Sequence, residues 1–257
     1  MTIQILVATM DRKNCDFLHD MNVKGDVIVV NQCDRNAFAE INGPDCSVKM
    51  ICTTKRGLSN SRNEAVLQAD ADIFLTADDD VVYMDNALEV IIKRFEEHPE
   101  ADVIAFNIDR HNVPENMTGG KQHGGWKMAP ANRYYPSVSL AYRRTSFEKA
   151  NLHFHPLFGA GGLYSSGEES LLLRDARKFG LRIFEAPECI ADVDFSASTW
   201  FSGYDAKFFF DKGAWVKTAY KHMYFIYKYY FLKLCRKSEL KYTEILRCLN
   251  DGIRSVR

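Results

Sequence analysis

Short runs of β-branched residues alternate with helical patterns over the first hundred or so residues, and this alternation restricts the chain to few folds. It is typical of βαβ units, in which helices connect the strands of a mostly parallel sheet. The pattern resumes after an irregular stretch. We therefore expect an α/β fold with a central mixed, mostly parallel sheet flanked by helices. The predicted strands are residues 3–8, 26–30, 48–52, 72–76, 103–107, 137–142 and 181–185, and the predicted helices are 59–69, capped by Ser59, 86–98 and 168–179.

Three consecutive carboxylates, Asp78, Asp79 and Asp80, follow the strand predicted at 72–76. In open α/β sheets the ligand crevice lies outside the carboxyl ends of the strands, so a site is expected here. Adjacent carboxylates raise one another's pKa unless a cation compensates them, and Mg²⁺ or Mn²⁺ bound to a diphosphate would do so. The alternative is a solvated acidic turn in which Asp80 or Asp85 caps the next helix.

A glycine-rich segment at 158–167 leads into a helix that opens with Glu168 and Glu169. A glutamate at the tip of a helix beside a crevice can act as a general base toward a hydroxyl group. The structural alternative is a helix cap, because Ser166 and Glu169 have the spacing of a capping box and the helix dipole favours acidic residues there.

A basic turn at residues 55–63 opens the helix after the third predicted strand and contains Arg56, Gly57 and Arg62. Backbone N–H groups, the helix dipole and Arg62 can together hold an anion such as a phosphate. The chain has neither G-x-G-x-x-G nor G-x-x-x-x-G-K-[ST], which excludes the dinucleotide fingerprint and the P-loop.

In order and spacing these segments resemble the family 2 glycosyltransferases, inverting nucleotide-sugar enzymes of GT-A fold. The resemblance covers about residues 3–195 and implies a GT-A catalytic domain at 1–200, with a nucleotide-sugar half at about 1–108 and an acceptor half at about 109–200. The matching segments are Ile5-Leu6-Val7-Ala8-Thr9, strand 27–30 with Asn31-Gln32-Cys33-Asp34, the Gly-x-x-x-x-Arg-Asn stretch from Gly57 to Asn63, the Asp-x-Asp pair Asp78 and Asp80, and Gly167-Glu168-Glu169 before Leu171-Leu172-Leu173.

The resemblance implies a role for each matched residue. Asp80, with Asp78, would bind the Mn²⁺ or Mg²⁺ that bridges the diphosphate oxygens. Glu169 would deprotonate the acceptor hydroxyl, and a single displacement would invert the anomeric carbon. The nucleotide-sugar site would comprise Thr9, Asp34, Arg56, Arg62, Asp78 and Asp79.

Two departures from the family pattern add candidates. The base is usually Asp in this family, so the longer Glu169 leaves Glu168 as a second candidate base. The family often supplies a histidine after the last strand, and residues 191–199 contain none. Asp192 or Asp194 would replace it at the metal, since carboxylate suits the same hard ion. The alternative for both is a plain edge-strand role.

The irregular stretch at residues 110–136 contains four glycines and three prolines and predicts a long loop. Loops of that length in a compact domain are usually functional or mobile. Trp126, Tyr134 and Tyr135 offer aromatic faces that can stack on a sugar ring, so the resemblance implies acceptor recognition or a lid. The alternative is a surface insertion pinned by a few aromatic side chains.

Residues 201–257 predict a basic, aromatic, helical tail. From 212 to 257 eleven Lys and Arg face three acidic residues, a net charge of +8 that leaves −9 on the rest of the chain. Residues 201–231 hold 13 of the 32 aromatic residues. Interleaved lysines predict an amphipathic helix on an anionic membrane, and the alternative is a helix packed on the catalytic domain. The acidic body and the lack of a binding motif argue against nucleic acid.

The expected activity is transfer of a sugar from a nucleotide-diphosphate donor, a UDP-sugar, to a hydroxyl of a glycan or lipid-linked acceptor, as in polysaccharide biosynthesis. A sugar-phosphate nucleotidyltransferase would share the scaffold and the metal, but is expected to carry a Gly-rich basic loop after the first strand, unlike residues 8–12. A non-catalytic sugar-binding or membrane-associated scaffold would not need both Asp80 and Glu169.

The cysteines and the N-terminus favour a cytoplasmic location. Seven cysteines show no zinc-ligand spacing and fit a reducing compartment. Neither a signal-peptide pattern nor an apolar stretch long enough to span a membrane is found. We therefore expect a cytoplasmic protein, peripheral on the membrane through residues 212–257, and the sequence predicts no oligomeric state.

Overall fold

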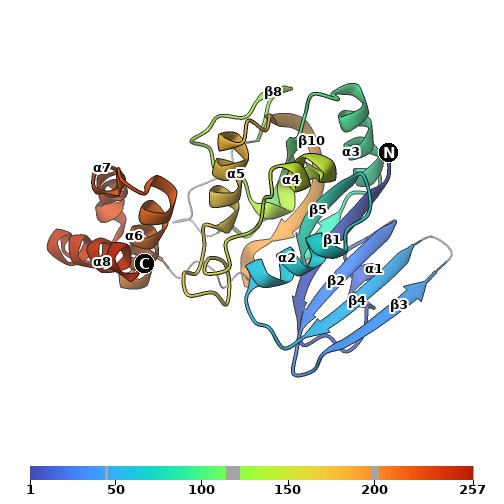
Figure 1. The fold of residues 1–257 in the computed structure, drawn as a ribbon, viewed down its shortest axis with the longest axis horizontal. Helices are drawn as coiled ribbons and strands as arrows, with labels where there is room; N and C mark the ends of the chain where they lie inside the picture. Colours follow the sequence, from blue (N-terminus) through green and yellow to red (C-terminus); the bar gives the residue numbers. More distant parts are fainter. Residues whose placement is uncertain (44–45, 114–121, 198–202, 257) are drawn as a thin grey trace.

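The computed structural model describes residues 1–43, 46–113, 122–197 and 203–256. Within these residues one mixed sheet has the strand order β3-β4-β2-β1-β5-β9-β7-β10-β6, and β8 pairs with β10 (Figure 1). The strands are β1 (Ile3–Met10), β2 (Asp26–Gln32), β3 (Ala37–Asn42), β4 (Ser47–Thr53), β5 (Ile73–Asp78), β6 (Val81–Tyr83), β7 (Val103–His111), β8 (Lys127–Met128), β9 (Leu140–Arg143) and β10 (Ile183–Asp194). The helices are α1 (Phe17–Asp20), α2 (Leu58–Gln68), α3 (Ala87–Glu97), α4 (Arg144–Lys149), α5 (Glu168–Lys178), α6 (Ala206–Tyr220), α7 (Tyr224–Tyr227) and α8 (Tyr242–Ser255), with 3-10 turns at Ser137–Ser139, Phe195–Ala197 and Lys228–Lys237.

The strand directions bring several carboxyl ends to one edge of the sheet. β1 is parallel to β2 and β5, and β2 is parallel to β4. β9 is antiparallel to both of its neighbours, β5 and β7, and β7 is parallel to β10. Hence β1, β2, β4, β5, β7 and β10 all run the same way, and the segments that follow them meet at one edge, where α/β proteins bind ligands.

Helices cover both faces of this sheet. On β1, Ile5 and Val7 point into one apolar cluster and Leu6 into the other, as the two-residue period of a strand requires. Buried residues of α1 and α3 join the first cluster, and those of α2, α4 and α5 join the second. The resulting α/β sandwich confirms the predicted fold class.

The described elements agree with most of the predicted ones, and the differences have local causes. The strand predicted at 137–142 begins as a 3-10 turn before β9. The strand predicted at 181–185 continues to Asp194 as β10, with register shifts after Glu185 beside Pro187, which has no N–H for the ladder. β3 was not predicted, because all six of its residues are exposed on the sheet edge and carry no buried face. Part of the predicted loop at 110–136, residues 114–121, lies outside the described residues.

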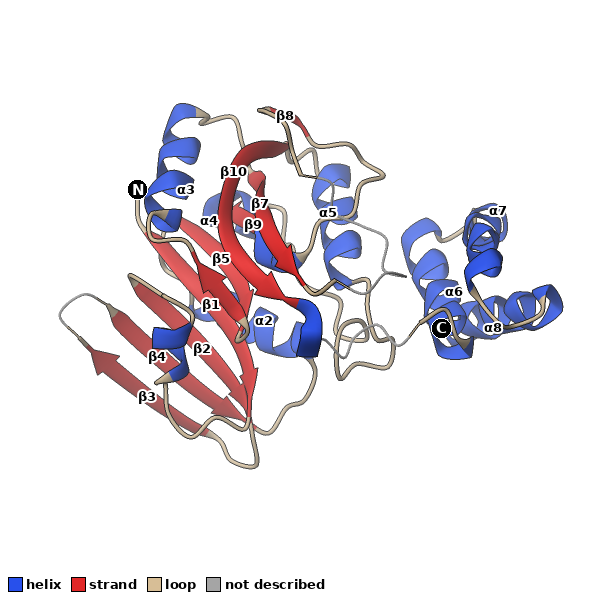
Figure 2. Cartoon of the chain, turned by 180° about the vertical axis from the view of Figure 1, so that it is seen from behind, coloured by secondary structure: helices blue, strands red, loops and turns tan. Residues whose placement is uncertain are grey.

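The C-terminal helices gather at one end of the molecule, beside α5 (Figure 2). α6 and α8 cross so closely that a Cβ on Gly213 would lie 2.1 Å from the Leu249 carbonyl oxygen, and one on Gly252 would lie 1.8 Å from that of Phe210. The predicted domain boundary at residue 200 falls outside the described residues, as does the aromatic Phe201. Among the helices that the structure describes, none is long and apolar enough to cross a membrane.

Candidate active site

The ends of β1, β2 and β5 lie side by side at the ligand edge of the sheet, with Ala8 of β1 paired to Asp78 of β5. Thr9, buried near the end of β1, donates from Oγ1 to Asp79 Oδ2 at 2.5 Å. The Arg12 guanidinium donates to the same oxygen at 2.7 and 2.9 Å. Thr9 and Asp79, both expected to bind the nucleotide-sugar, therefore bind each other and fix the turn after β5 to the end of β1.

Arg62 of α2 is the centre of the site, with only 1% of the residue exposed. Its guanidinium donates to Asp78 Oδ1 at 3.0 Å and to the Oε1 atoms of Glu168 and Glu169, both at 3.2 Å. A fourth bond, of 2.6 Å, reaches Ser137 Oγ. Arg62 thus contacts three acidic residues that follow it in the chain by 16, 106 and 107 positions. These contacts bring the Arg-Asn, Asp-x-Asp and Gly-Glu-Glu segments to one point.

Burial sets the protonation of this cluster. Burial by itself lowers the pKa of Arg62, but the charges of Asp78, Glu169 and Glu168 outweigh it and raise that pKa, so the guanidinium stays charged. Burial and then the negative charge of Glu169 raise the pKa of Glu168 to about 8. A proton on Glu168 is therefore favoured at neutral pH, which leaves Glu169 as the candidate base of the two.

The alternative interpretation of Glu169 as a helix cap is wrong. α5 begins after Gly167, whose φ of +115° suits glycine and which has no side chain to cap the helix, so the expected Ser166 capping box is not formed. Ser166 Oγ instead accepts a hydrogen bond from Lys212 Nζ at 3.4 Å. Glu169 is 7% exposed and its carboxylate faces Arg62, inside the site.

The basic turn before α2 is bound to protein groups. The Gly57 N–H donates to Gln32 Oε1 at 2.7 Å, and the Leu58 N–H donates to the Ala160 carbonyl at 2.9 Å. Arg56 donates to the Gln32 carbonyl at 3.0 Å from a half-exposed position. The N–H groups of Gly57 and Leu58 are therefore occupied by protein acceptors. The expected cap, Ser59, lies inside the helix, where its hydroxyl donates to the Phe158 carbonyl at 2.6 Å. Correspondingly, Gly57 and not Ser59 is the N-cap residue, with φ +108°.

Asp80 is the carboxylate of the triplet that is left for a cation. Asp78 is paired with Arg62 and Asp79 with Arg12. Although Asp80 as a residue is exposed, desolvation of its carboxyl group and then the charges of Asp78 and Asp79 raise its pKa to about 6. A divalent cation would relieve this repulsion, and hard carboxylate oxygens suit Mg²⁺ or Mn²⁺. Asp80 and Asp85, the two expected caps, do not cap α3. This helix begins after Asn86 without a side-chain cap, and Asp85 instead pairs with Lys24 at 2.8 Å.

Asp192 and Asp194 lie near the carboxyl end of β10, at the same edge. Asp192 faces His111 Nε2 at 3.2 Å, and Asp194 accepts from the Asn112 amide at 3.0 Å. Among the residues that the structure describes, no three His, Cys, Asp or Glu side chains converge as a preformed metal site. A cation at Asp80 would thus need ligand oxygens from a diphosphate or water, which is the common way in which Mg²⁺ binds.

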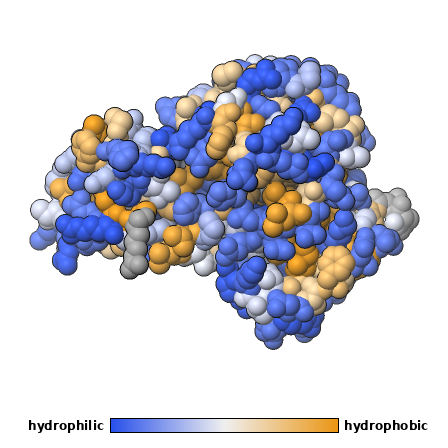
Figure 3. Space-filling model, in the orientation of Figure 1, coloured by the Kyte–Doolittle hydropathy of each residue, from blue (hydrophilic) through white to orange (hydrophobic). Residues whose placement is uncertain are grey.

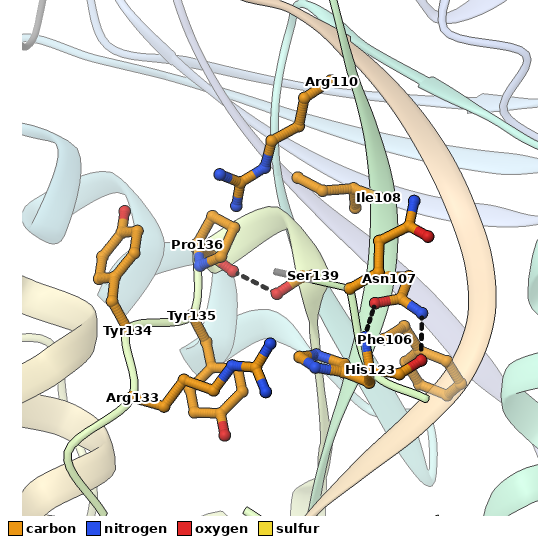
Figure 4. Close-up of a pocket in the computed structure, with 11 residues that line it drawn as sticks. Phe106, Asn107, Ile108, Arg110, His123, Arg133, Tyr134, Tyr135, Pro136 and Ser139 are labelled. Atoms are coloured by element: carbon orange, nitrogen blue, oxygen red, sulfur yellow. Dashed lines mark hydrogen bonds between the residues drawn. The ribbon is translucent and has the colours of Figure 1, made fainter. Parts of the chain in front are cut away.

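A polar pocket opens between the end of β7 and the segment that precedes β9 (Figure 4). Its lining includes Arg110 from β7 and Tyr134, which is 44% exposed. The Asn107 side chain holds the backbone of His123 by two hydrogen bonds, of 3.1 and 2.7 Å, and so fixes the far wall. Of the three aromatic residues expected at the acceptor, Tyr134 and Tyr135 both line this pocket, but Tyr134 is exposed whereas Tyr135 is buried.

The other two aromatic residues are packed in the domain. Tyr135 is 1% exposed and its hydroxyl donates to the buried Glu185 at 2.6 Å. Trp126 stacks between His98 and Phe184, with ring centroids 3.7 and 4.8 Å apart. Phe184 lies near the start of β10, so Trp126 is at the end of the sheet opposite the ligand edge. The alternative of aromatic residues that pin an insertion therefore holds for Tyr135 and Trp126.

Sequence reasoning missed the contacts between α6 and the start of α5. A Cβ on Gly167 would lie 2.5 Å from Trp215 Cδ1, and Trp215 Nε1 donates to Ser170 Oγ at 3.0 Å. Lys212 bonds to Ser166, and burial lowers its pKa although Asp211, Glu168 and Glu169 oppose that change. The sequence shows only that Trp215 and Lys212 lie in the expected helical tail. Nothing in their spacing indicates a contact with α5.

Asp34, the remaining expected nucleotide contact, is exposed in the bend that follows β2. It lies at the ligand edge, beyond the end of β2. Ser137, which holds Arg62, was not expected at the site, and Gln32, which holds the turn before α2, was expected only as part of the matched segment 31–34, with no role of its own. Both are ordinary polar residues in sequence, so only the fold identifies them.

Comparison with known proteins shows the family and the fold of the chain. The model of the glycosyl transferase family 2 matches residues 24–165. No curated protein sequence matches the chain. Among solved structures, S. aureus TarS 1–349 is 14% identical with a TM-score of 0.65, covering 100% of this chain and 81% of that one. TarS 1–349 in complex with UDP-GlcNAc is 16% identical with a TM-score of 0.66 and coverages of 100% and 82%.

The fold and the site define a GT-A glycosyltransferase. The family match covers more than half of the chain and includes the basic turn, Arg62 and the Asp triplet. The protein belongs to the family 2 glycosyltransferases. The match ends before Glu168 and Glu169, whose place in the site follows from their contacts with Arg62.

Proposed function

We propose that the protein transfers a sugar from a UDP-sugar to a hydroxyl group of a glycan or lipid-linked acceptor, with inversion at the anomeric carbon. The observation that carries this proposal is the convergence of Asp78, Glu168 and Glu169 on the buried Arg62. The donor class is supported by the complex of TarS 1–349 with UDP-GlcNAc, a protein of the same fold.

Glu169 is the proposed general base. The acceptor oxygen attacks the anomeric carbon as its proton passes to Glu169, and the bond from that carbon to the diphosphate oxygen breaks with its electron pair on the diphosphate. Glu168 holds its own proton in the neutral range, because burial raises its pKa to about 8, and so does not compete for the acceptor proton. Arg62 fixes the Glu169 carboxylate through the 3.2 Å contact.

The residues at the ligand edge fit a divalent cation. Asp80 would hold Mn²⁺ or Mg²⁺ with help from Asp78, and Asp192 or Asp194 would approach from β10. When bound, the ion would neutralise the charge that develops on the leaving diphosphate. Asp34 and Arg56 remain exposed at this edge for contacts with the nucleotide.

Donor turnover tests the proposal. A panel of UDP- and GDP-sugars with and without Mn²⁺ should show turnover with a UDP-sugar that depends on the metal. Glu169→Gln should lower kcat about 100-fold or more and leave UDP binding intact, because a positioned base contributes about 10²–10⁴ in rate. Asp80→Ala should lose metal-dependent turnover.

The matched controls are Glu40→Gln on β3 and Asp20→Asn on α1, two exposed carboxylates that make none of the contacts of the site. Both should retain full turnover. Wild-type rates in Glu169→Gln and Asp80→Ala together would overturn the mechanism.

A further inference from the structure

The C-terminal tail divides into two parts by burial. α6 is anchored on the catalytic domain, with Ala214 and Ala219 in a cluster with Leu171 of α5, and α8 buries Ile245 and Leu249 against α6. Between them, neither α7 nor the 3-10 turn Lys228–Lys237 has a buried residue. Of the tail expected to contact a membrane, residues 212–257, residues 221–237 are therefore the part left free for such a contact. We call residues 221–237 the aromatic-basic segment.

Apolar and aromatic side chains are exposed along this segment. Figure 3 shows a group of apolar residues at the upper left, over α7. Single exposed apolar residues are normal on a protein surface, but a contiguous group of them marks an interaction site. The residues with their exposed fractions are Met223 (50%), Phe225 (53%), Ile226 (51%), Tyr227 (37%), Tyr229 (53%) and Tyr230 (64%).

The same segment is strongly basic. Between Asp211 and Glu239 the chain has no acidic residue, and residues 221–237 contain five Lys and Arg. Lys233 lies 5.1 Å from the centre of the Tyr230 ring, so the ammonium groups accompany the exposed rings. A second copy of this surface would bring like charges together, whereas an anionic surface would be attracted.

We propose that the aromatic-basic segment docks on the surface of an anionic lipid bilayer. Phe225, Ile226 and the exposed tyrosines would enter the headgroup region, where amphipathic rings are favoured, and the basic side chains would face anionic headgroups. No described helix can span a bilayer, so the segment lies in the plane of the interface. The inference deepens the proposed function, because it names the surface on which a lipid-linked acceptor is presented, and binding to vesicles requires no catalysis.

Co-sedimentation with vesicles tests this surface. The full chain should bind vesicles of phosphatidylcholine with 30% phosphatidylglycerol and not vesicles of phosphatidylcholine alone, and added salt should weaken binding. Phe225→Ser with Ile226→Ser should weaken binding at least tenfold, as should Lys233→Glu with Arg236→Glu. The matched control is Phe38→Ser with Ile41→Ser on β3, which are similarly exposed at 62% and 51% and should leave binding unchanged.

Donor hydrolysis without lipid separates this inference from the proposed function. All three double variants should hydrolyse the donor at the wild-type rate, since none of the changed residues is among those placed at the site. Wild-type binding by both segment variants, equal loss in the β3 control, or no binding by the unchanged protein would overturn the inference. So would wild-type self-association that the segment variants abolish, because the patch would then be a contact between copies.

Discussion

Arg62 pairs with three acidic side chains, Asp78, Glu168 and Glu169, while its own guanidinium is almost completely buried. A buried charge is tolerated where it is paired, and removal of one partner leaves the others uncompensated. The Arg62 side chain is 1% exposed, against 5% for Glu168, 9% for Glu169 and 38% for Asp78. The stability of the folded protein should therefore depend strongly on Arg62 alone.

Replacement of Arg62 tests this dependence. Arg62→Met keeps much of the side-chain volume but removes the charge, and should lower the free energy of unfolding by about 3–5 kcal/mol, the usual cost of breaking a buried pair. Urea denaturation gives the difference. Arg247→Met is the control, because Arg247 is 84% exposed and pairs with Asp251 at the surface, and it should change stability by less than about 1 kcal/mol. Equal effects of the two changes would contradict a central role for Arg62.

Glu168 makes stability depend on pH in the direction opposite to an ordinary ion-paired carboxylate. Its pKa is about 8 in the folded protein and near its ordinary value of 4.5 in the unfolded chain, so between these values the folded state binds more protons. The free energy of unfolding should therefore fall as pH rises from about 4.5 to 8. The contribution of this group is fully present below about pH 4.5 and is lost by about pH 8.

Glu168→Gln isolates this effect, because the amide cannot ionise. Relative to the wild type, the variant should gain stability progressively between pH 5 and 8, by up to a few kcal/mol, since one pKa unit corresponds to about 1.4 kcal/mol. Unfolding in urea at several pH values measures the difference, with Glu40→Gln as the control. Parallel curves for Glu168→Gln and the wild type would show that Glu168 does not titrate in this range.

At the scale of elements, the start of α5 is fixed by α6. Gly167 combines a φ of +115° with a contact to Trp215, whereas Gly180 at the other end of α5 has a φ of +83° and no atom within 4 Å of an added Cβ. The two glycines share the left-handed backbone and differ in their neighbours. The same substitution at the two glycines therefore distinguishes the cost of backbone strain from the cost of steric overlap on one helix.

Gly167→Ala should cost more stability than Gly180→Ala. The left-handed conformation costs an alanine about 1–2 kcal/mol in both, and at Gly167 the overlap 2.5 Å from Trp215 Cδ1 adds to it. Gly167→Ala should also reduce donor turnover, because the displaced helix start carries Glu168 and Glu169. Thermal unfolding and donor hydrolysis measure the two effects. Equal losses of stability in the two variants would mean that Trp215 of α6 moves aside with no cost in free energy.

The sequence predicts the elements of this site better than their contacts. α2 was predicted from its apolar residues behind an expected cap at Ser59, and α5 from the helical pattern that follows the glycine-rich segment, because these signals are local. The partners of Arg62 were not, since Glu168 and Glu169 lie over a hundred residues away and an arginine in a basic turn points equally well to a phosphate. Trp126 was misjudged for the same reason, because the ring that it stacks on, Phe184, belongs to a distant strand.

At the scale of the whole molecule, the separation of charge now has a structural basis. The body carries −9 and includes the carboxylates of the ligand edge, while the +8 tail divides into helices that hold α5 and an exposed basic segment. Because Asp80 lacks a cationic partner among the described residues, the body should bind a nucleotide diphosphate far better with a divalent ion. A ligand that binds the folded state and not the unfolded state must then stabilise the entire chain against unfolding.

Thermal unfolding with ligands measures this coupling. UDP with Mn²⁺ at about 100 times its dissociation constant should add about 2.7 kcal/mol, which is a rise of roughly 5–10 °C in Tm for a chain of this size. UDP with EDTA, or Mn²⁺ alone, should give much less, and Asp80→Asn should remove the difference between UDP with and without Mn²⁺. Asp20→Asn, a change on the exposed face of α1, should keep it. An equal rise with UDP in the presence of Mn²⁺ or EDTA would show that the diphosphate is held by the protein's own side chains, and that Asp80 serves another purpose.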